Sequence, residues 1–166
     1  MARSILSQTG RVDWGLGSFD VYRSRLIQGK YAEPENLGEA INSPAHETSV
    51  YIAPNESLLL FSSLGRDDAQ AGGGALYPRS DLYISYFREG KWTVAKNLGQ
   101  VINSVAEESN PFVSPDGTYL FFSSERNFTS VPMNRWINHK ELTARLHSPG
   151  NGLSDIYQVE MSVLPY

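Results

Sequence analysis

The chain repeats itself, and this repeat limits the folds that it can adopt more than any other feature. When the sequence of 166 residues is shifted by 61 positions, residues 20–63 align with residues 81–124 without a gap. Of the 44 aligned positions, 18 are identical, including Asn-Leu-Gly, Ile-Asn-Ser and Phe-Ser-Ser in both copies. After Asp-Val-Tyr at residues 20–22 and Asp-Leu-Tyr at 81–83, a third Asp-x-Tyr follows at residues 155–157. Repeats of this size are typical of supersecondary units that bury their apolar surfaces against one another.

Each repeat unit predicts four short β-strands. In the second unit, the segment DLYISYF is rich in β-forming residues and ends at the turn REGK. The strands that we expect in this unit are residues 81–87, 91–98, 109–113 and 118–124. Residues 4–7, with the sequence SILS, are expected to be the remnant of one more strand before the first repeat.

The last two predicted strands of the second unit are joined by the tight turn Ser-Pro-Asp-Gly. Pro115 fixes φ for the first central position of this turn, Asp116 suits the second, and Gly117 supplies a left-handed residue. The first unit has Glu56 where the second has this glycine. Because a Cβ atom in the left-handed region costs about 1 kcal/mol, we expect the first turn to be less regular.

The predicted strands LLLF (58–61) and YLFF (119–122) are apolar on both faces. An antiparallel sheet with one face in water would alternate instead, so we expect both faces to be covered. Four-stranded repeats with two covered faces predict an all-β fold built of antiparallel β-propeller blades. A β-sandwich made of duplicated halves is the alternative architecture.

The repeat organisation predicts one domain over residues 1–166. Its repeat units are residues 20–80 and 81–154, between partial blades at 1–19 and 155–166. Because a β-propeller needs about four or more blades, we expect a partial propeller that associates with missing blades or with further copies of itself. The end blades of such a fragment expose apolar faces and strand edges.

Two long connectors indicate the end of the fold where binding is expected. The connector 64–80 has 17 residues and the connector 125–154 has 30, whereas the turns REGK and SPDG are short. In an up-and-down meander, the long connectors share one end of the sheets and the short turns share the other. Binding residues gather on long loops that a rigid scaffold holds, so we expect a site at the long-connector end.

A short helix is predicted within the connector 125–154. Asn138 can cap its first turn, and Leu142 and Leu146 lie four residues apart on one side. We expect this helix to pack as a lid on the propeller, with Trp136 buried beneath it.

Composition excludes several classes of protein. The net charge of −4 argues against a nucleic-acid-binding surface, and no run reaches the roughly 18 apolar residues of a membrane helix. The chain has no cysteine and its three histidines form no HExxH pattern, so neither a disulfide framework nor a zinc site is expected. No motif identifies a cofactor or a catalytic residue.

The candidate ligand-binding residues lie where the long connectors meet the strands. Glu47 and Glu108 are equivalent in the repeat and are expected at the mouth of a central channel. Such carboxylates can bind a cation, hydrogen-bond a sugar or act as acid and base, or they can accept hydrogen bonds from the backbone of the adjacent loop. Arg66 and Arg126 can hold an anionic ligand or bridge neighbouring blades. The aromatic candidates are Trp14, Tyr77 and Trp136.

Four segments carry a resemblance to a known family. SPDGTYLFFSS, SDLYIS, GKWTVAKNLG and SPGNGLSDIY resemble the WD40-like (PD40) repeats of TolB-type β-propellers, over roughly residues 14–160. The resemblance implies the fold and, because such proteins are typically exported, a periplasmic or secreted location. The opening residues, MARSILSQTG, lack the apolar stretch of a secretory signal. The resemblance implies little about activity, because one fold hosts many functions.

Three functions remain open from the sequence. The favoured one is a non-catalytic binding module that presents its long-connector end to a glycan, peptide or protein partner. The alternative is a carbohydrate-active hydrolase or lyase, with Glu47 or Glu108 as acid or base and Arg66 or Arg126 holding an anionic group. The third is a structural propeller fragment that helps to assemble a larger complex.

Overall fold

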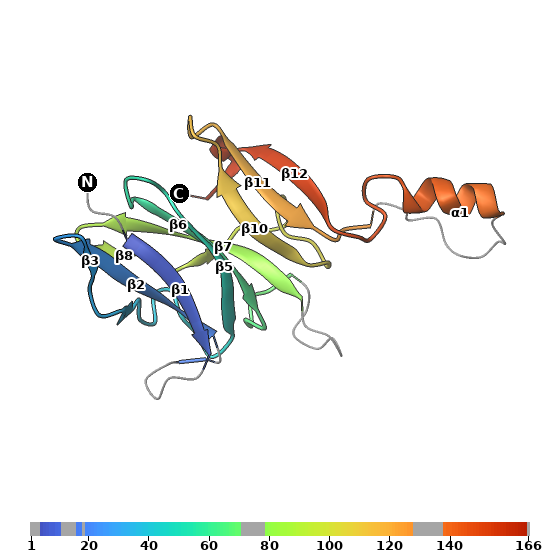
Figure 1. Ribbon diagram of the computed structural model, residues 1–166. Coiled ribbons are helices and arrows are strands. Elements are labelled where there is room, and N and C mark those ends of the chain that lie inside the picture. Colours follow the sequence, from blue (N-terminus) through green and yellow to red (C-terminus); the bar gives the residue numbers. More distant parts are fainter. Residues whose placement is uncertain (1–3, 11–15, 18, 71–78, 128–137, 166) are drawn as a thin grey trace.

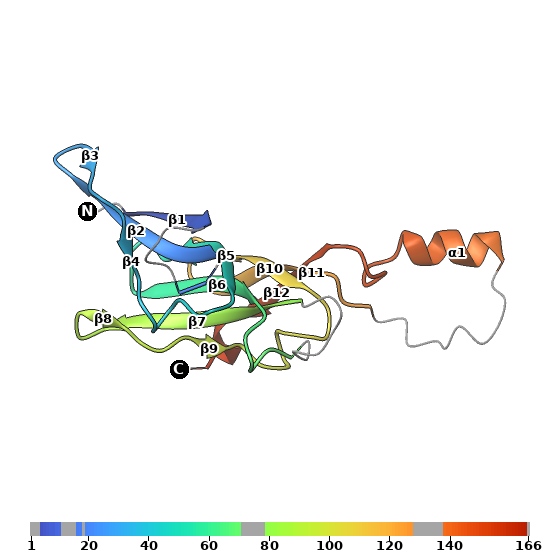
Figure 2. The ribbon, with the colours of Figure 1, turned by 90° about the horizontal axis from the view of Figure 1, so that it is seen from below.

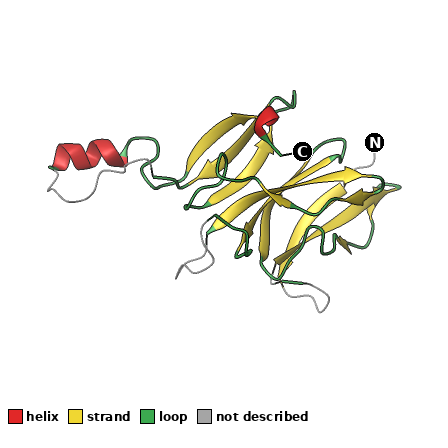
Figure 3. Cartoon of the chain, turned by 180° about the vertical axis from the view of Figure 1, so that it is seen from behind, coloured by secondary structure: helices red, strands yellow, loops and turns green. Residues whose placement is uncertain are grey.

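The computed structural model describes residues 4–10, 16–17, 19–70, 79–127 and 138–165. The protein is mostly β, with one short helix and a curled sheet (Figures 1 and 3). The elements are β1 (Ser4–Gly10), β2 (Phe19–Ile27), β3 (Lys30–Tyr31), β4 (Glu35–Asn36), β5 (His46–Ile52), β6 (Leu58–Leu64), β7 (Ser80–Arg88), β8 (Lys91–Trp92), β9 (Lys96–Asn97), β10 (Glu108–Val113), β11 (Tyr119–Ser124), α1 (His139–Leu146), β12 (Asp155–Glu160) and the 3-10 turn η1 (Met161–Val163).

The strands form two hydrogen-bonded sheets. The larger has the order β1-β2-β5-β6-β7-β8, with β3 and β4 also paired with β2 and β9 paired with β7. A single parallel pair, Phe19 with His46, joins β2 to β5, and the sheet curls. The smaller sheet has the order β10-β11-β12. Along the chain the strands fall into three groups: β1 to β4, then β5 to β9, which we call the central strands, and then the smaller sheet of β10 to β12, which we call the third sheet.

The hydrogen-bonded units are out of phase with the sequence repeat. Strands β5 and β6 come from the first repeat, yet β6 pairs antiparallel along its whole length with β7, from the second. The third sheet is built in the same way, because the hairpin β10–β11 pairs with β12 after the connector 125–154. Each sequence unit therefore contributes to two neighbouring groups of strands.

The prediction of one continuous strand over residues 91–98 is wrong. The structure has two short pieces, β8 and β9, with a break at residues 93–95. At this break the backbone turns to a neighbouring loop, and the Ala95 N–H donates to the Ala40 carbonyl at 2.8 Å. The Thr93 hydroxyl accepts a hydrogen bond from the Tyr86 N–H. These bonds replace the ladder that a continuous strand would make.

Apolar side chains cover both faces of β6. Leu59 and Phe61 belong to one core cluster with Val21 of β2, and Leu58 and Leu60 belong to a second cluster with side chains of the third sheet. The predicted two-sided burial is therefore confirmed for residues 58–61. In β11 only alternate residues are fully buried, so the same prediction holds on one face alone.

The first strands of the two hairpins are distorted at equivalent positions. The register shifts between Thr48 and Tyr51 in β5, and between Ser109 and Phe112 in β10. Within these shifts Ser49 and Asn110 have φ of 48° and 52°. The Ser49 hydroxyl donates to the Asn110 side-chain oxygen at 3.3 Å, so the two distortions meet where β5 and β10 lie side by side.

The two SPDG-type turns have the same form, and the prediction that the first is less regular is wrong. Glu56 adopts φ of 56° and Gly117 adopts φ of 74°. Each N–H donates at 2.8 Å to the carbonyl three residues earlier, in Ala53 and Ser114 respectively. Glu56 also lies 3.9 Å from the Arg23 guanidinium, a contact that accompanies its left-handed conformation.

The long connectors leave the strands at the same end, away from the β2–β3 and β7–β8 turns (Figure 2). Helix α1 forms as predicted, and the Asn138 side chain accepts a hydrogen bond from the Glu141 N–H. The helix has no buried residue and stands away from the sheets (Figures 1 and 2). Its predicted packing as a lid is therefore wrong, because Leu142 and Leu146 are exposed.

Candidate functional site

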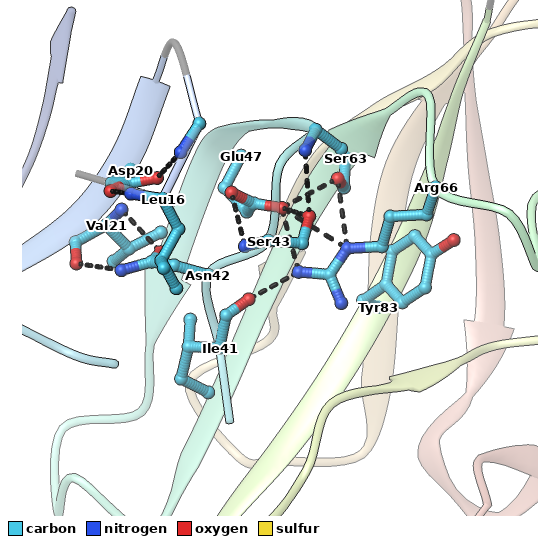
Figure 4. Close-up of polar contacts among 12 residues, drawn as sticks. Leu16, Asp20, Val21, Ile41, Asn42, Ser43, Glu47, Ser63, Arg66 and Tyr83 are labelled. Atoms are coloured by element: carbon cyan, nitrogen blue, oxygen red, sulfur yellow. Dashed lines mark hydrogen bonds and ion pairs between the residues drawn. The ribbon is translucent and has the colours of Figure 1, made fainter. Parts of the chain in front are cut away.

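Glu47 sits in a closed hydrogen-bond network at the start of β5 (Figure 4). Its carboxylate accepts from the N–H and the hydroxyl of Ser43, at 3.2 and 2.6 Å, and from the Ser63 hydroxyl at 3.0 Å. The Arg66 guanidinium donates to it at 2.8 Å. Glu47 is 0% exposed, so all its polar capacity is directed to the protein itself.

Arg66 is held on the opposite side by aromatic rings. Its guanidinium carbon lies 4.6 Å from the centre of the Tyr83 ring and 5.2 Å from that of Phe61. The guanidinium also donates to the Ile41 carbonyl. This combination of stacking, ion pairing and backbone hydrogen bonding fixes the planar group in one orientation.

The second repeat builds the same network around Glu108. Its carboxylate accepts from the Ser104 N–H and hydroxyl, at 2.9 and 2.6 Å, and from the Ser124 hydroxyl at 2.7 Å. Arg126 lies 3.2 Å from this carboxylate and stacks over the rings of Phe122 and Tyr157. The structure thus brings each sequence-predicted glutamate together with its sequence-predicted arginine.

These two networks tie the backbone together. Both oxygens of each carboxylate accept hydrogen bonds, and each network joins the loop before a hairpin to the end of that hairpin. Glu108 is also 0% exposed. As placed, neither carboxylate reaches solvent, where a substrate would approach.

The aromatic candidates lie outside the described residues. Trp14, Tyr77 and Trp136 all fall in segments that the structure does not describe. Within the described ranges, no group of three or more His, Asp or Glu side chains is arranged to hold a metal ion.

A pair of hydrogen-bonded asparagines in each repeat, one buried and one half-buried, was missed by the sequence reasoning. The Asn42 side chain accepts from the Val21 N–H at 2.7 Å and donates to the Val21 carbonyl at 3.1 Å. It also donates to the side-chain oxygen of Asn36. Asn103 and Asn97 repeat this arrangement on Leu82. Their identity in both copies was the available signal, since a repeated amide in an apolar stretch indicates a fixed backbone contact.

Three equivalent aspartates anchor the connectors. Asp20 accepts from the N–H groups of Leu16 and Gly17, Asp81 from that of Gln70, and Asp155 from that of Gly150. Burial raises the pKa of the Asp81 carboxyl, an effect that the hydrogen bonds from Gln70 and Asn97 oppose. These aspartates explain the repeated Asp that opens each unit.

A pocket of about 360 Å³ opens at the long-connector end. Its lining residues are Ser43, Pro44, Ala45, Gly65, Arg66, Asp67 and Asp68. Asp67 and Asp68 are exposed, and Asp68 accepts a hydrogen bond from the Tyr83 hydroxyl at 2.8 Å. Burial and this hydrogen bond raise the pKa of Tyr83. The pocket therefore has an acidic rim above the Glu47–Arg66 network.

A larger pocket, of about 580 Å³, lies at the opposite end. It opens between the turn that follows Ala53 and the turn that follows Ser114, with Tyr51, Phe112 and Met161 among its lining residues. The rings of Tyr51 and Phe112 meet edge to face at 5.6 Å. The two equivalent hairpin turns thus open a pocket at the short-turn end, in addition to the one at the long-connector end where the sequence predicts a site.

Comparison of the sequence with protein-family models and with curated proteins finds no match. Among the described residues, no helix has the length and apolar character needed to cross a membrane. Any functional conclusion therefore depends on the geometry of the chain itself.

Proposed function

We propose that this protein is a non-catalytic binding module built on a partial β-propeller. The strands β5, β6, β7 and β9 pair antiparallel in succession, as in a propeller blade. The third sheet packs on one face of these strands and Val21 of β2 on the other. Inner strands that lie side by side, as β5 and β10 do, support the blade arrangement. The same stacking supports association with further blades, from the same or another chain.

The proposal of binding rather than catalysis rests on which polar side chains are bound to the protein itself and which are open to solvent. Several polar residues that recur in the repeat are buried and engaged in internal hydrogen bonds, as Glu47 and Glu108 are. Asp67 and Asp68 lie outside the aligned repeat and line an open pocket. A carboxylate rim suits ligands that offer hydroxyl or ammonium donors, so a glycan, a basic peptide or a protein partner is the proposed ligand class.

Carbohydrate hydrolysis is the weaker alternative. It needs two carboxyl groups about 5–9 Å apart on either side of an open site, whereas Glu47 and Glu108 are each enclosed by their own serines and arginine. Their enclosure supports a scaffold role. A periplasmic or secreted location is proposed from the resemblance to exported propeller proteins alone.

A matched pair of double variants tests the proposed pocket. Binding of the full chain to immobilised oligosaccharide and peptide panels is compared for wild type, Asp67→Asn/Asp68→Asn and the control Glu33→Gln/Glu39→Gln. The control removes the same charge from two other exposed carboxylates. We expect the first variant alone to lose ligands, with an unchanged melting temperature. Equal binding by both variants contradicts the pocket assignment, and glycoside turnover that Glu108→Gln abolishes contradicts the non-catalytic role.

A further inference from the structure

Three strands of the fold begin with the same motif, and their outer edges differ. Strands β2, β7 and β12 carry Asp-x-Tyr at residues 20–22, 81–83 and 155–157. Each pairs on its inner side with the preceding strand of its group, β1, β6 and β11 respectively. We call the opposite edge of each strand its outer edge. Because the three strands are equivalent, the segments that pair with the outer edges of β2 and β7 indicate what kind of segment can bind the outer edge of β12.

Two asparagines clamp the outer edge of β7. Asn103 exchanges two hydrogen bonds with the backbone of Leu82, at 2.8 and 3.0 Å. Asn97, in β9, pairs with Tyr83 and donates to the Asp81 carboxylate at 2.7 Å. The segment that supplies both amides has the sequence Asn-Leu-Gly-Gln-Val-Ile-Asn.

The outer edge of β2 is clamped in the same way. Asn42 exchanges two hydrogen bonds with the backbone of Val21, and Asn36 donates to the Asp20 carboxylate at 3.1 Å. Here the segment reads Asn-Leu-Gly-Glu-Ala-Ile-Asn. Both clamps therefore share the pattern Asn-Leu-Gly-x-x-Ile-Asn.

The clamp segment also contributes two apolar side chains to the buried cluster that contains the strand it holds. Leu98 and Ile102 belong to the same buried cluster as Leu82, which is 0% exposed. At β2, Ile41 lies in the same buried cluster as Val21. The leucine and isoleucine of the motif thus pack in the same cluster as the residue whose backbone the second asparagine binds.

Strand β12 has the features that a clamp binds in β2 and β7, but the described residues place no clamp segment on it. Among the described residues, it pairs only with β11, and the Asp155 carboxylate accepts a hydrogen bond from Gly150. Ile156, at the position of Leu82 and Val21, is 80% exposed. The strand therefore offers an open edge, an acceptor carboxylate and an uncovered apolar side chain at the three places where a clamp acts.

We propose that the outer edge of β12 is a docking site for an extended segment of a partner polypeptide that carries Asn-Leu-Gly-x-x-Ile-Asn. The first asparagine donates to Asp155, and the second exchanges two hydrogen bonds with the backbone of Ile156. The leucine and isoleucine cover the Ile156 side chain. Recognition is thus strand addition to an open sheet edge, with specificity from side chains at fixed spacing.

The composition of β12 favours a single segment over a whole sheet as the occupant. Gln158 and Glu160 are exposed on the same side of the strand as Ile156. The equivalent positions in β7 are Ile84 and Tyr86, and Ile84 is buried against the third sheet. A broad apolar contact would place Gln158 and Glu160 in a dry interface, whereas a clamp needs only the part of the strand near Ile156.

A peptide from the chain itself supplies the probe. A fluorescent peptide with the sequence of residues 95–105, AKNLGQVINSV, is titrated with the full-length protein and followed by anisotropy. We expect saturable binding, and binding weaker by about tenfold or more when both asparagines of the peptide are replaced by alanine, because the hydrogen bonds that they make are lost.

Protein variants locate the binding on β12. Ile156→Asp places a charge where the leucine and isoleucine of the peptide would pack, and we expect it to weaken binding about tenfold or more. Because Ile156 is exposed, the fold is retained, which circular dichroism checks. The matched control is Ile27→Asp, also at an exposed isoleucine, and it leaves binding unchanged. Amide hydrogen exchange at Ile156 slows in the wild-type complex.

The proposal is overturned if the peptide does not bind at millimolar concentration, or if the peptide without asparagines binds as well as the original. It is also overturned if Ile156→Asp binds as wild type does, since the peptide would then be displacing an internal clamp. This site does not depend on the connector-end pocket. The Asp67→Asn/Asp68→Asn variant is expected to bind the peptide normally, so the two proposals can fail separately.

Discussion

The central strands and the third sheet carry similar sequences and differ in how well they are covered. Leu82 of β7 is fully buried, whereas Ile156, at the equivalent place in β12, lies mostly in solvent. Residues 58–63 of β6 are all buried, whereas burial alternates along β11. The difference teaches that the repeat sequence sets the strands, and that the neighbouring unit decides which of their faces are covered.

The polar networks follow a different rule. The Glu47–Arg66 network in the central strands and the Glu108–Arg126 network in the third sheet have nearly the same partners and distances. They form although only one of the two units is covered on both faces. Such a network is a local property of one hairpin and its flanking loops, and it needs no further stacking.

The largest expected effect tests whether the two networks contribute equally to stability although only one of them lies in a unit that is covered on both faces. Glu47→Ala and Glu108→Ala each remove the partner of a mostly buried arginine, and we expect a loss of about 3–5 kcal/mol in the free energy of unfolding. Urea denaturation followed by tryptophan fluorescence measures it. The losses should agree to about 1 kcal/mol if the networks are local. A much smaller loss for Glu108→Ala would mean that burial of the surrounding unit strengthens the network.

A second pair of variants measures the difference in cover directly. Leu82→Ala removes a fully buried side chain and is expected to cost about 3 kcal/mol, whereas Ile156→Ala is expected to cost less than about 0.5 kcal/mol. Both variants change one branched apolar residue to alanine in equivalent strands, so each controls the other. Equal destabilisation, measured by the shift in the urea midpoint, would show that Ile156 is covered in solution.

A third variant asks what the amide clamp contributes where it is present. Asn103→Ala leaves the N–H and the carbonyl of Leu82 without the partners seen in the structure, at a cost of about 2 kcal/mol. Asn103→Asp keeps an acceptor for the N–H, but it puts a buried carboxylate oxygen against the Leu82 carbonyl, so at neutral pH we expect a loss at least as large as that of Asn103→Ala. Thermal unfolding of the two variants ranks their losses of stability. An Asn103→Ala variant with the melting temperature of the wild type would contradict the role of the clamp.

The smallest expected effect concerns the two equivalent turns. Gly117→Ala places a Cβ in the left-handed region and should destabilise the protein by about 1 kcal/mol. Glu56→Gly should stabilise it by a similar or smaller amount, because it relieves the same strain and loses only the long Arg23 contact. Differential scanning calorimetry separates the signs, and two shifts of the same sign would contradict the equivalence of the turns.

The sequence predicted most of the strands, because they depend on short-range pattern and on the repeat, although it missed the break at residues 93–95. The repeat also marked the two glutamates and the two arginines as equivalent residues, but it did not predict that each glutamate pairs with an arginine. It predicted a short helix within residues 125–154 through the Asn138 cap, which is also local, and the structure places that helix at His139–Leu146. It did not predict that the helix stands away from the sheets, because packing depends on where the connector carries it. The identical asparagines gave a signal in the repeat, but their buried role required the three-dimensional pairing of residues 21 positions apart.

The offset between the sequence repeat and the hydrogen-bonded groups has a consequence for how such a chain can grow. A duplication of residues 20–80 adds strands that complete one hydrogen-bonded group and begin the next. Each new copy is therefore covalently connected to the groups on both sides of it. A deletion at the same boundaries cuts through two groups and rejoins them with matching edges. Length can therefore change by whole units during evolution without leaving a half-built sheet in the middle of the stack.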